Sequence, residues 1–248
     1  MNVSVRQMAD FRDNPILFVK LAHEWVAGGP VPEPQVEAWL RELPRPLISD
    51  PSAAREALWG ALSYPERGRA LAWLDKIGLL EEIIPAWAGD PRRRALRLQS
   101  VEEVHLERWA GGLSDTTSDW LSVYQDQRVD GRLGGWAMSG LTTLLLTGDD
   151  PVDVHSQRVA ADLKKLGANE GERERVVTAI REYPDLYRAV TTCTLPARTF
   201  SPTGIVAVLA DLMNVPGVSD ETRSGWISCA DRLLTRYAAP DHAPGRLR

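Results

Sequence analysis

Residues 63–87 constrain the fold most, because they contain a helix whose two ends are both marked. Ser63 is suited to cap the N-terminus, and Pro65 suits the first turn. The apolar face at helical spacing comprises Ala70, Leu71, Trp73, Leu74 and Ile77. Gly78 predicts a left-handed stop, after which the chain folds back before Pro85. The segment therefore predicts two packed helical pieces joined at a glycine.

This segment resembles a signature of the helical body of bacterial CCA-adding enzymes (tRNA nucleotidyltransferases) and their poly(A) polymerase relatives. The matching residues are Ala70, Leu74, Gly78, Leu79, Leu80, Ile83 or Ile84, and Pro85. Upstream, a helix predicted at 14–28 begins where the family has an Asp-Pro-x-Arg-x-x-Arg segment, but Leu17 and Lys20 occupy the arginine positions. The resemblance implies a neck and body that contact tRNA.

Helical patterning continues along the rest of the chain, and no pair of alternating strands with a hairpin turn is visible. Helices are predicted at 34–43, 51–62, 63–77, 101–111, 117–127, 131–146, 151–166, 171–182, 184–191, 202–213 and 220–237. We expect an all-α fold. Ser100 with Glu103 predicts a capping box, and Gly167 predicts a helix stop.

The order of the later helices resembles the HD domain attached to many CCA-adding enzymes. Residues 153–163 look like its third helix and 176–180 like its fourth. We therefore predict a neck and body domain over residues 1–92, a degenerate HD-like domain over 93–238 and a disordered tail over 239–248.

Neither kind of catalytic chemistry implied by the resemblance is expected. The nucleotidyltransferase head of the family lies upstream and holds two magnesium ions through a Gly-Ser and an Asp-x-Asp pair. The residues before Asn14 contain neither pair, so nucleotidyl transfer would need a head from a separate chain.

HD phosphohydrolases also need several His and Asp side chains that converge on metal. The diagnostic His-Asp position falls within 137–142, which has no such residue. His105 and His155 remain as weak metal candidates. Their ordinary interpretations are a core position for His105 and a surface or half-buried position for His155. The acidic run at 149–153 either replaces the ligands or favours a helix N-terminus. We expect no metal and no cofactor.

Four arginines within residues 90–97 form the strongest local positive charge, and guanidinium groups suit phosphate oxygens. The candidate RNA contacts are Arg92, Arg93, Arg94 and Arg97, with Trp87 and Trp109 as the nearest rings that could stack on bases. The ordinary interpretation, which we favour, is an exposed linker whose charges serve solvation. Most other tryptophans fall on the apolar faces of predicted helices.

The net charge of −5 argues against a protein that coats nucleic acid through bulk charge. Two cysteines are too few for a disulfide framework, and no long apolar run or signal peptide is visible, so we expect a cytoplasmic protein outside the membrane. Three functions stay open. They are a non-catalytic module that binds tRNA or a separate nucleotidyltransferase head, an HD-type phosphohydrolase with displaced ligands, and a protein–protein scaffold.

Overall fold

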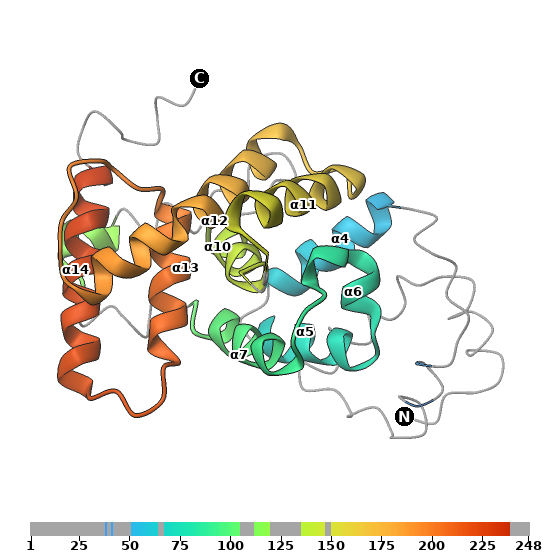
Figure 1. The fold of residues 1–248 in the computed structure, drawn as a ribbon, viewed down its shortest axis with the longest axis horizontal. Helices are drawn as coiled ribbons and strands as arrows, with labels where there is room; N and C mark the ends of the chain where they lie inside the picture. Colours follow the sequence, from blue (N-terminus) through green and yellow to red (C-terminus); the bar gives the residue numbers. More distant parts are fainter. Residues whose placement is uncertain are drawn as a thin grey trace.

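The fold is all-α, as the sequence predicted. The structure is a computed structural model, and it describes residues 38, 41, 51–63, 67–104, 112–119, 135–146 and 150–238. Within these ranges the chain forms helices and no strand (Figure 1). The elements are α4 (Pro51–Leu62), α5 (Arg67–Lys76), α6 (Leu79–Ile83), the 3-10 helix η1 (Pro85–Trp87), α7 (Pro91–Glu102), α10 (Gly135–Leu144), α11 (Val152–Lys165), α12 (Glu170–Thr191), α13 (Pro202–Met213) and α14 (Asp220–Ala238). None of these helices has the length and apolar character needed to cross a membrane.

The glycine stop between α5 and α6 is confirmed. Gly78 has a φ of 75° and a ψ of 10°, the left-handed conformation that glycine adopts without a steric penalty. The chain then turns back so that α6 packs on α5. Trp87, at the end of η1, is fully buried, and its indole Nε1–H donates to the Asp75 carboxylate at 2.6 Å. Ala86 is held in turn by the buried Asp162 of α11, whose carboxylate accepts its backbone N–H at 2.7 Å.

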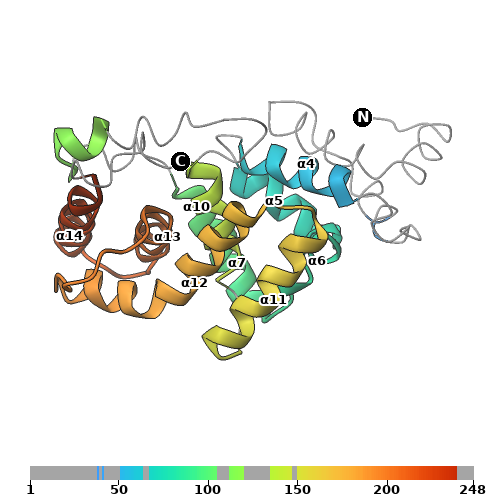
Figure 2. The same ribbon diagram turned by 90° about the horizontal axis from the view of Figure 1, so that it is seen from above.

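Buried apolar residues form two core clusters. The first draws on helices from α4 through α11 and on the N-terminal part of α12 as far as Ile180. The second begins on α12 at Leu186 and is completed by α13, α14 and Val104. Both views show α14 at one end of the molecule and α4 with α6 at the other, with α7 and α10 between them (Figures 1 and 2). The first cluster continues across residue 92, where the sequence analysis placed a domain boundary.

Helix α12 joins the two clusters as one continuous element. The prediction of separate helices at 171–182 and 184–191 is wrong, because α12 continues through Pro184. A proline inside a helix removes one backbone hydrogen bond and favours a break. Here the packing of both halves of α12, against α11 on one side and α13 on the other, maintains the helix.

The predicted arginine linker is also wrong, because residues 91–102 form α7. The local signals for this helix are present: the Asp90 side chain caps the Arg92 N–H, and Pro91 occupies the first turn. The predicted capping box at Ser100 fails for the same reason. Ser100 lies inside α7, and Glu103 lies at its C-terminal end.

Some of the other predicted features lie within the described residues, and others lie outside them. The Ser63 hydroxyl donates to the Trp59 carbonyl of the preceding α4 at 2.8 Å. The predicted N-terminal cap at Ser63 lies partly outside the described residues, since 64–66 are not among them. The predicted features at 14–28, 239–248, His105 and Trp109 also lie outside. Gly167 is a confirmed helix stop, with a φ of 75°.

Candidate functional site

Helix α7 gathers the four candidate arginines, but it directs them to different surroundings. Arg92 and Arg93 lie in its first turn and are exposed. Arg94 and Arg97 lie on the faces that pack against the rest of the molecule and make internal ion pairs. Only the first two therefore face solvent, and we call them the exposed arginine turn.

Arg94 and Trp87 meet at one carboxylate. Arg94 lies 3.1 Å from the Glu81 carboxylate and 3.8 Å from that of Asp75, measured from its Nη1 atom. Asp75 also accepts the Trp87 indole N–H. The structure thus brings these two predicted residues together, yet it buries the Trp87 ring completely, so this ring packs in the core rather than presenting a face to a base.

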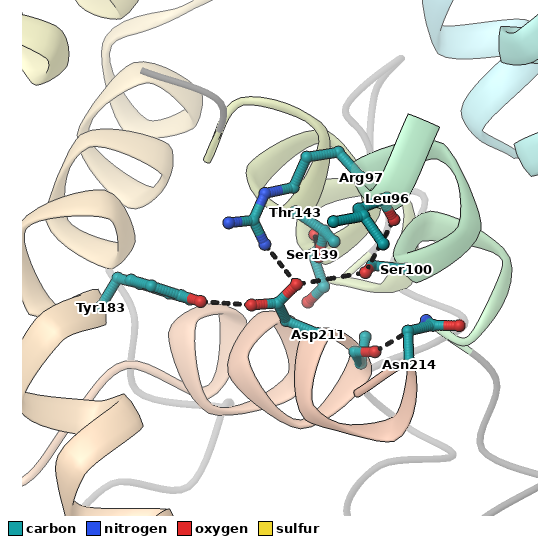
Figure 3. Close-up of polar contacts among 9 residues, drawn as sticks. Leu96, Arg97, Ser100, Ser139, Thr143, Tyr183, Asp211 and Asn214 are labelled. Atoms are coloured by element: carbon teal, nitrogen blue, oxygen red, sulfur yellow. Dashed lines mark hydrogen bonds and ion pairs between the residues drawn. The ribbon is translucent and has the colours of Figure 1, made fainter. Parts of the chain in front are cut away.

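Arg97 belongs to a buried polar group that also includes Ser100, Tyr183 and Asp211, here named the Asp211 cluster. Figure 3 shows the Asp211 carboxylate of α13 pointing between Arg97 of α7 and Tyr183 of α12. The Arg97 guanidinium and the Tyr183 hydroxyl donate to the two oxygens of this carboxylate. The Arg97 guanidinium carbon lies 5.7 Å from the Tyr183 ring centre, within the range of a cation–π contact. The cluster therefore connects three helices at the junction of the two core clusters.

Burial and charge fix the protonation states in the Asp211 cluster. The side chains of Arg97 and Asp211 are each 16% exposed. Burial by itself lowers the pKa of Arg97, but the Asp211 carboxylate and Tyr183 outweigh this effect and raise it. Burial, followed by the Asp211 carboxylate, raises the pKa of Tyr183 against the opposing charge of Arg97. At neutral pH the cluster accordingly holds a guanidinium and a neutral phenol.

The Ser100 hydroxyl is the third donor of the cluster, and it has two possible acceptors. The Ser100 hydroxyl lies 3.0 Å from the Leu96 carbonyl oxygen and 3.2 Å from Asp211 Oδ1, and its single proton serves one of them at a time. Both Asp211 oxygens are already occupied by stronger, charge-assisted or phenolic donors. Donors from α7 and α12 converge on this one carboxylate of α13, an arrangement that holds the three helices together.

A second buried arginine anchors the other end of α7. Arg67 of α5 donates to the Val104 carbonyl at 2.8 Å, and the Glu102 carboxylate accepts the backbone N–H of Gly68. Burial lowers the pKa of Arg67 to about 10, and Glu102 opposes this shift. Polar contacts along α7 thus attach it to α5 and α6 on one side and to α12 and α13 on the other.

Residues 137–142, where the sequence resemblance would place a His-Asp motif, contribute to the core. On α10, Ala137, Met138 and Leu141 are buried in the first core cluster. The hydroxyl of Thr142 donates to the Met138 carbonyl at 3.0 Å, within the same helix. The described residues contain no group of three or more His, Cys, Asp or Glu side chains that could hold a metal ion.

His155 is buried rather than half-buried, with 5% of its surface exposed. Its Nε2 lies 2.5 Å from the Leu145 carbonyl oxygen. Since a carbonyl only accepts, this nitrogen carries a proton and donates, which removes its lone pair from metal binding. The nearby Asp150 pairs with Arg158 on the surface of α11.

Sequence reasoning missed Asp211 and Tyr183, although one signal was available for Asp211. Within 202–213 it is the only charged residue of an otherwise apolar helix. A lone carboxylate in such a helix needs a buried partner, because an unpaired buried charge is very unfavourable. Nothing in the sequence identifies Arg97 as that partner, since 114 residues separate the two.

A scan against protein-family models and a search of curated proteins gave no match to this chain.

Proposed function

We propose that this chain is a non-catalytic helical module that binds RNA of the tRNA type, through phosphate contacts of the exposed arginine turn. The observation that supports the proposal is the position of Arg92 and Arg93 in the first turn of α7, both exposed. Two guanidinium groups side by side suit phosphate oxygens, whereas the backbone N–H of Arg92 at this helix end is already capped by the Asp90 carboxylate. The resemblance to the body of CCA-adding enzymes supports the same class of ligand.

Other charges limit the size of such a site. Arg94 is committed to Glu81 and Asp75, and Arg97 is committed to Asp211. Among the four arginines of α7, the two exposed ones, Arg92 and Arg93, are therefore the proposed phosphate contacts. We expect weak, salt-sensitive binding, because each phosphate contact releases condensed counterions.

Fluorescence anisotropy with labelled bulk tRNA over a range of salt concentrations tests the proposal. Changing Arg92→Gln and Arg93→Gln together should weaken binding and reduce the slope of log affinity against log salt by about 2. The matched control is Arg175→Gln with Arg188→Gln, which removes the same charge from the exposed surface of α12 and should leave binding unchanged. Absence of tRNA affinity at low salt, or equal binding by the two double variants, would contradict the proposal.

A protein partner is the second candidate, and Leu96 favours it. This side chain is 48% exposed and lies one turn after Arg92 and Arg93, so the three share one face of α7. Arginine is enriched at contact surfaces between proteins, and an exposed leucine on the same face adds apolar area to such a contact. The partner could be a separate nucleotidyltransferase head or another chain for which this protein is a scaffold.

A pull-down from the native host, analysed for both RNA and protein, separates the two candidates. Loss of tRNA from the Arg92→Gln, Arg93→Gln variant with retention by Leu96→Ser supports RNA binding. Loss of a protein from Leu96→Ser while tRNA is absent from every sample supports the second candidate.

A further inference from the structure

The two cysteines of the chain, distant in sequence, lie at one site between the C-terminal end of α12 and the middle of α14. Cys193 is exposed and Cys229 is buried. The Cys229 thiol donates to the Ala189 carbonyl oxygen at 3.6 Å, and the same oxygen accepts the backbone N–H of Thr194, the residue after Cys193. Both sulfurs are thus held around the last turn of one helix.

Arg232 completes the site. It lies three residues after Cys229 on α14, so both side chains project from one face of that helix. Its Nη2 atom is 2.8 Å from the Cys193 sulfur. A guanidinium donor at this distance stabilises negative charge on sulfur, which is the form that attacks oxidants.

The backbone at Cys193 is unusual for a cysteine. Its φ is 52°, and it is the only residue other than glycine with a positive φ in the described part of the chain. It occupies the position after the C-cap of α12, where its own N–H bonds to the Val190 carbonyl at 3.3 Å and the Thr194 N–H to that of Ala189 at 2.9 Å. Glycine usually fills this left-handed position. This conformation directs the thiol toward α14 and Arg232, whereas glycine would leave the position without a side chain.

We propose that Cys193 and Cys229 are a redox-active thiol pair, which a hydroperoxide converts to a reversible disulfide. The Cys193 thiolate attacks the peroxide O–O bond, takes one oxygen to become a sulfenic acid and releases water or an alcohol after protonation. The Cys229 sulfur then attacks the sulfenic sulfur, and the Cys229 proton leaves with the sulfenic hydroxyl as a second water. A small dithiol reverses the reaction by thiol–disulfide exchange.

The chemistry of the two thiols suits this division of roles. Cys193 is accessible to a peroxide and has the guanidinium beside it, as an attacking thiol requires. Burial, and then the neighbouring Cys193, raise the pKa of Cys229 to about 11, with Arg232 opposing. Cys229 thus stays protonated and resists direct oxidation, and its sulfur lies against the turn that carries Cys193, from which we expect it to resolve a sulfenic acid on Cys193.

Labelling of the full chain tests the proposal cleanly, because the sequence contains only these 2 cysteines. The reduced protein is treated with stoichiometric hydrogen peroxide, denatured, blocked with N-ethylmaleimide and weighed by mass spectrometry. We expect a monomer that has lost two hydrogens and takes up no label, and full labelling of both thiols after dithiothreitol. Two labelled thiols after peroxide, or a disulfide found only between two chains, would overturn the proposal.

Variants assign the roles. Cys229→Ala should accumulate a sulfenic acid that dimedone traps at Cys193, and in Cys193→Ser the buried Cys229 should stay reduced. Arg232→Gln should slow disulfide formation by about tenfold, the factor that corresponds to the loss of a charge-assisted hydrogen bond. Arg236→Gln is the matched control, since this arginine lies one turn further along α14 and donates to the Pro196 carbonyl at 2.8 Å. Equal rates for the two arginine variants would show that Arg232 plays no part, and dimedone labelling of Cys229 in Cys193→Ser would overturn the assignment.

Discussion

At the scale of single residues, the protein depends on buried polar groups with fixed protonation states. Tyr183 illustrates this, because its phenol is buried against the Asp211 carboxylate and its pKa is raised. The folded state therefore keeps the Tyr183 proton at a pH where the unfolded chain has lost it. The stability that this contributes is fully present below the unfolded pKa of about 10 and falls as pH rises above that value.

We predict that Tyr183→Phe reduces this alkaline loss of stability. At neutral pH the variant should be less stable by about 1–3 kcal/mol, since Asp211 loses a donor. Urea unfolding at several pH values between about 8 and 11 would compare it with the wild type. Arg67, whose pKa is lowered by burial, is present in both proteins, so its contribution cancels in the comparison. The difference between the two proteins isolates Tyr183, and parallel pH profiles would contradict the prediction.

At the scale of elements, α7 is held closely against α5. A Cβ placed on Gly68 would lie 2.8 Å from the Leu98 carbonyl oxygen, closer than real Cβ atoms come, and 3.0 Å from Glu102 Cβ, a tight contact. The helices can therefore cross here only with glycine at this position. The hydrogen bond from the Gly68 N–H to Glu102 uses the same close approach.

We predict that Gly68→Ala destabilises the protein by about 1–3 kcal/mol, because α5 and α7 must move apart. The matched control is Gly225→Ala on α14, where a Cβ meets nothing within 4 Å. This control should be neutral or stabilise by up to about 1 kcal/mol, since alanine favours helix more than glycine. Urea unfolding measures both, and an equal effect of the two substitutions would show that the crossing tolerates a side chain.

At the scale of the whole molecule, the Asp211 cluster lies where the two core clusters meet. Helix α12 contributes to both clusters, while α13 packs against α7 and α10. Both clusters use residues of α12, so neither can form completely without a helix that the other also needs. We therefore expect the described helices to unfold together.

We predict that tryptophan fluorescence and far-UV circular dichroism report one coincident urea transition. Trp59, Trp73 and Trp87 are buried in the first core cluster and Trp226 packs against the second, so fluorescence reports on both cores, whereas circular dichroism reports every helix. Asp211→Asn should lower the free energy of unfolding by about 3 kcal/mol or more, because it leaves the Arg97 charge buried without its counterion. Asp220→Asn, at a fully exposed carboxylate, is the control and should have no measurable effect. Separate transitions in the wild type, or equal stability of the two Asn variants, would contradict this description.

The sequence by itself determined the features that depend on a few adjacent residues. Helical periodicity predicted the all-α class, and Gly78 and Gly167 predicted helix ends that the structure confirms. These predictions succeed because they depend on local properties. A glycine permits the left-handed dihedral angles of a helix end, and the spacing of apolar residues indicates the helical period.

Only the tertiary structure decided which side chains meet. The arginines of α7 divide between solvent and buried carboxylates because α13 and α6 place Asp211 and Glu81 beside that helix. Helix α12 continues past Pro184 because packing on both sides offsets one lost hydrogen bond. The two cysteines meet only when α14 packs against the end of α12. Ion pairs and thiol contacts form only between residues that packing brings together. Burial of the apolar core drives that packing, and a short stretch of sequence does not show which distant residues it will join.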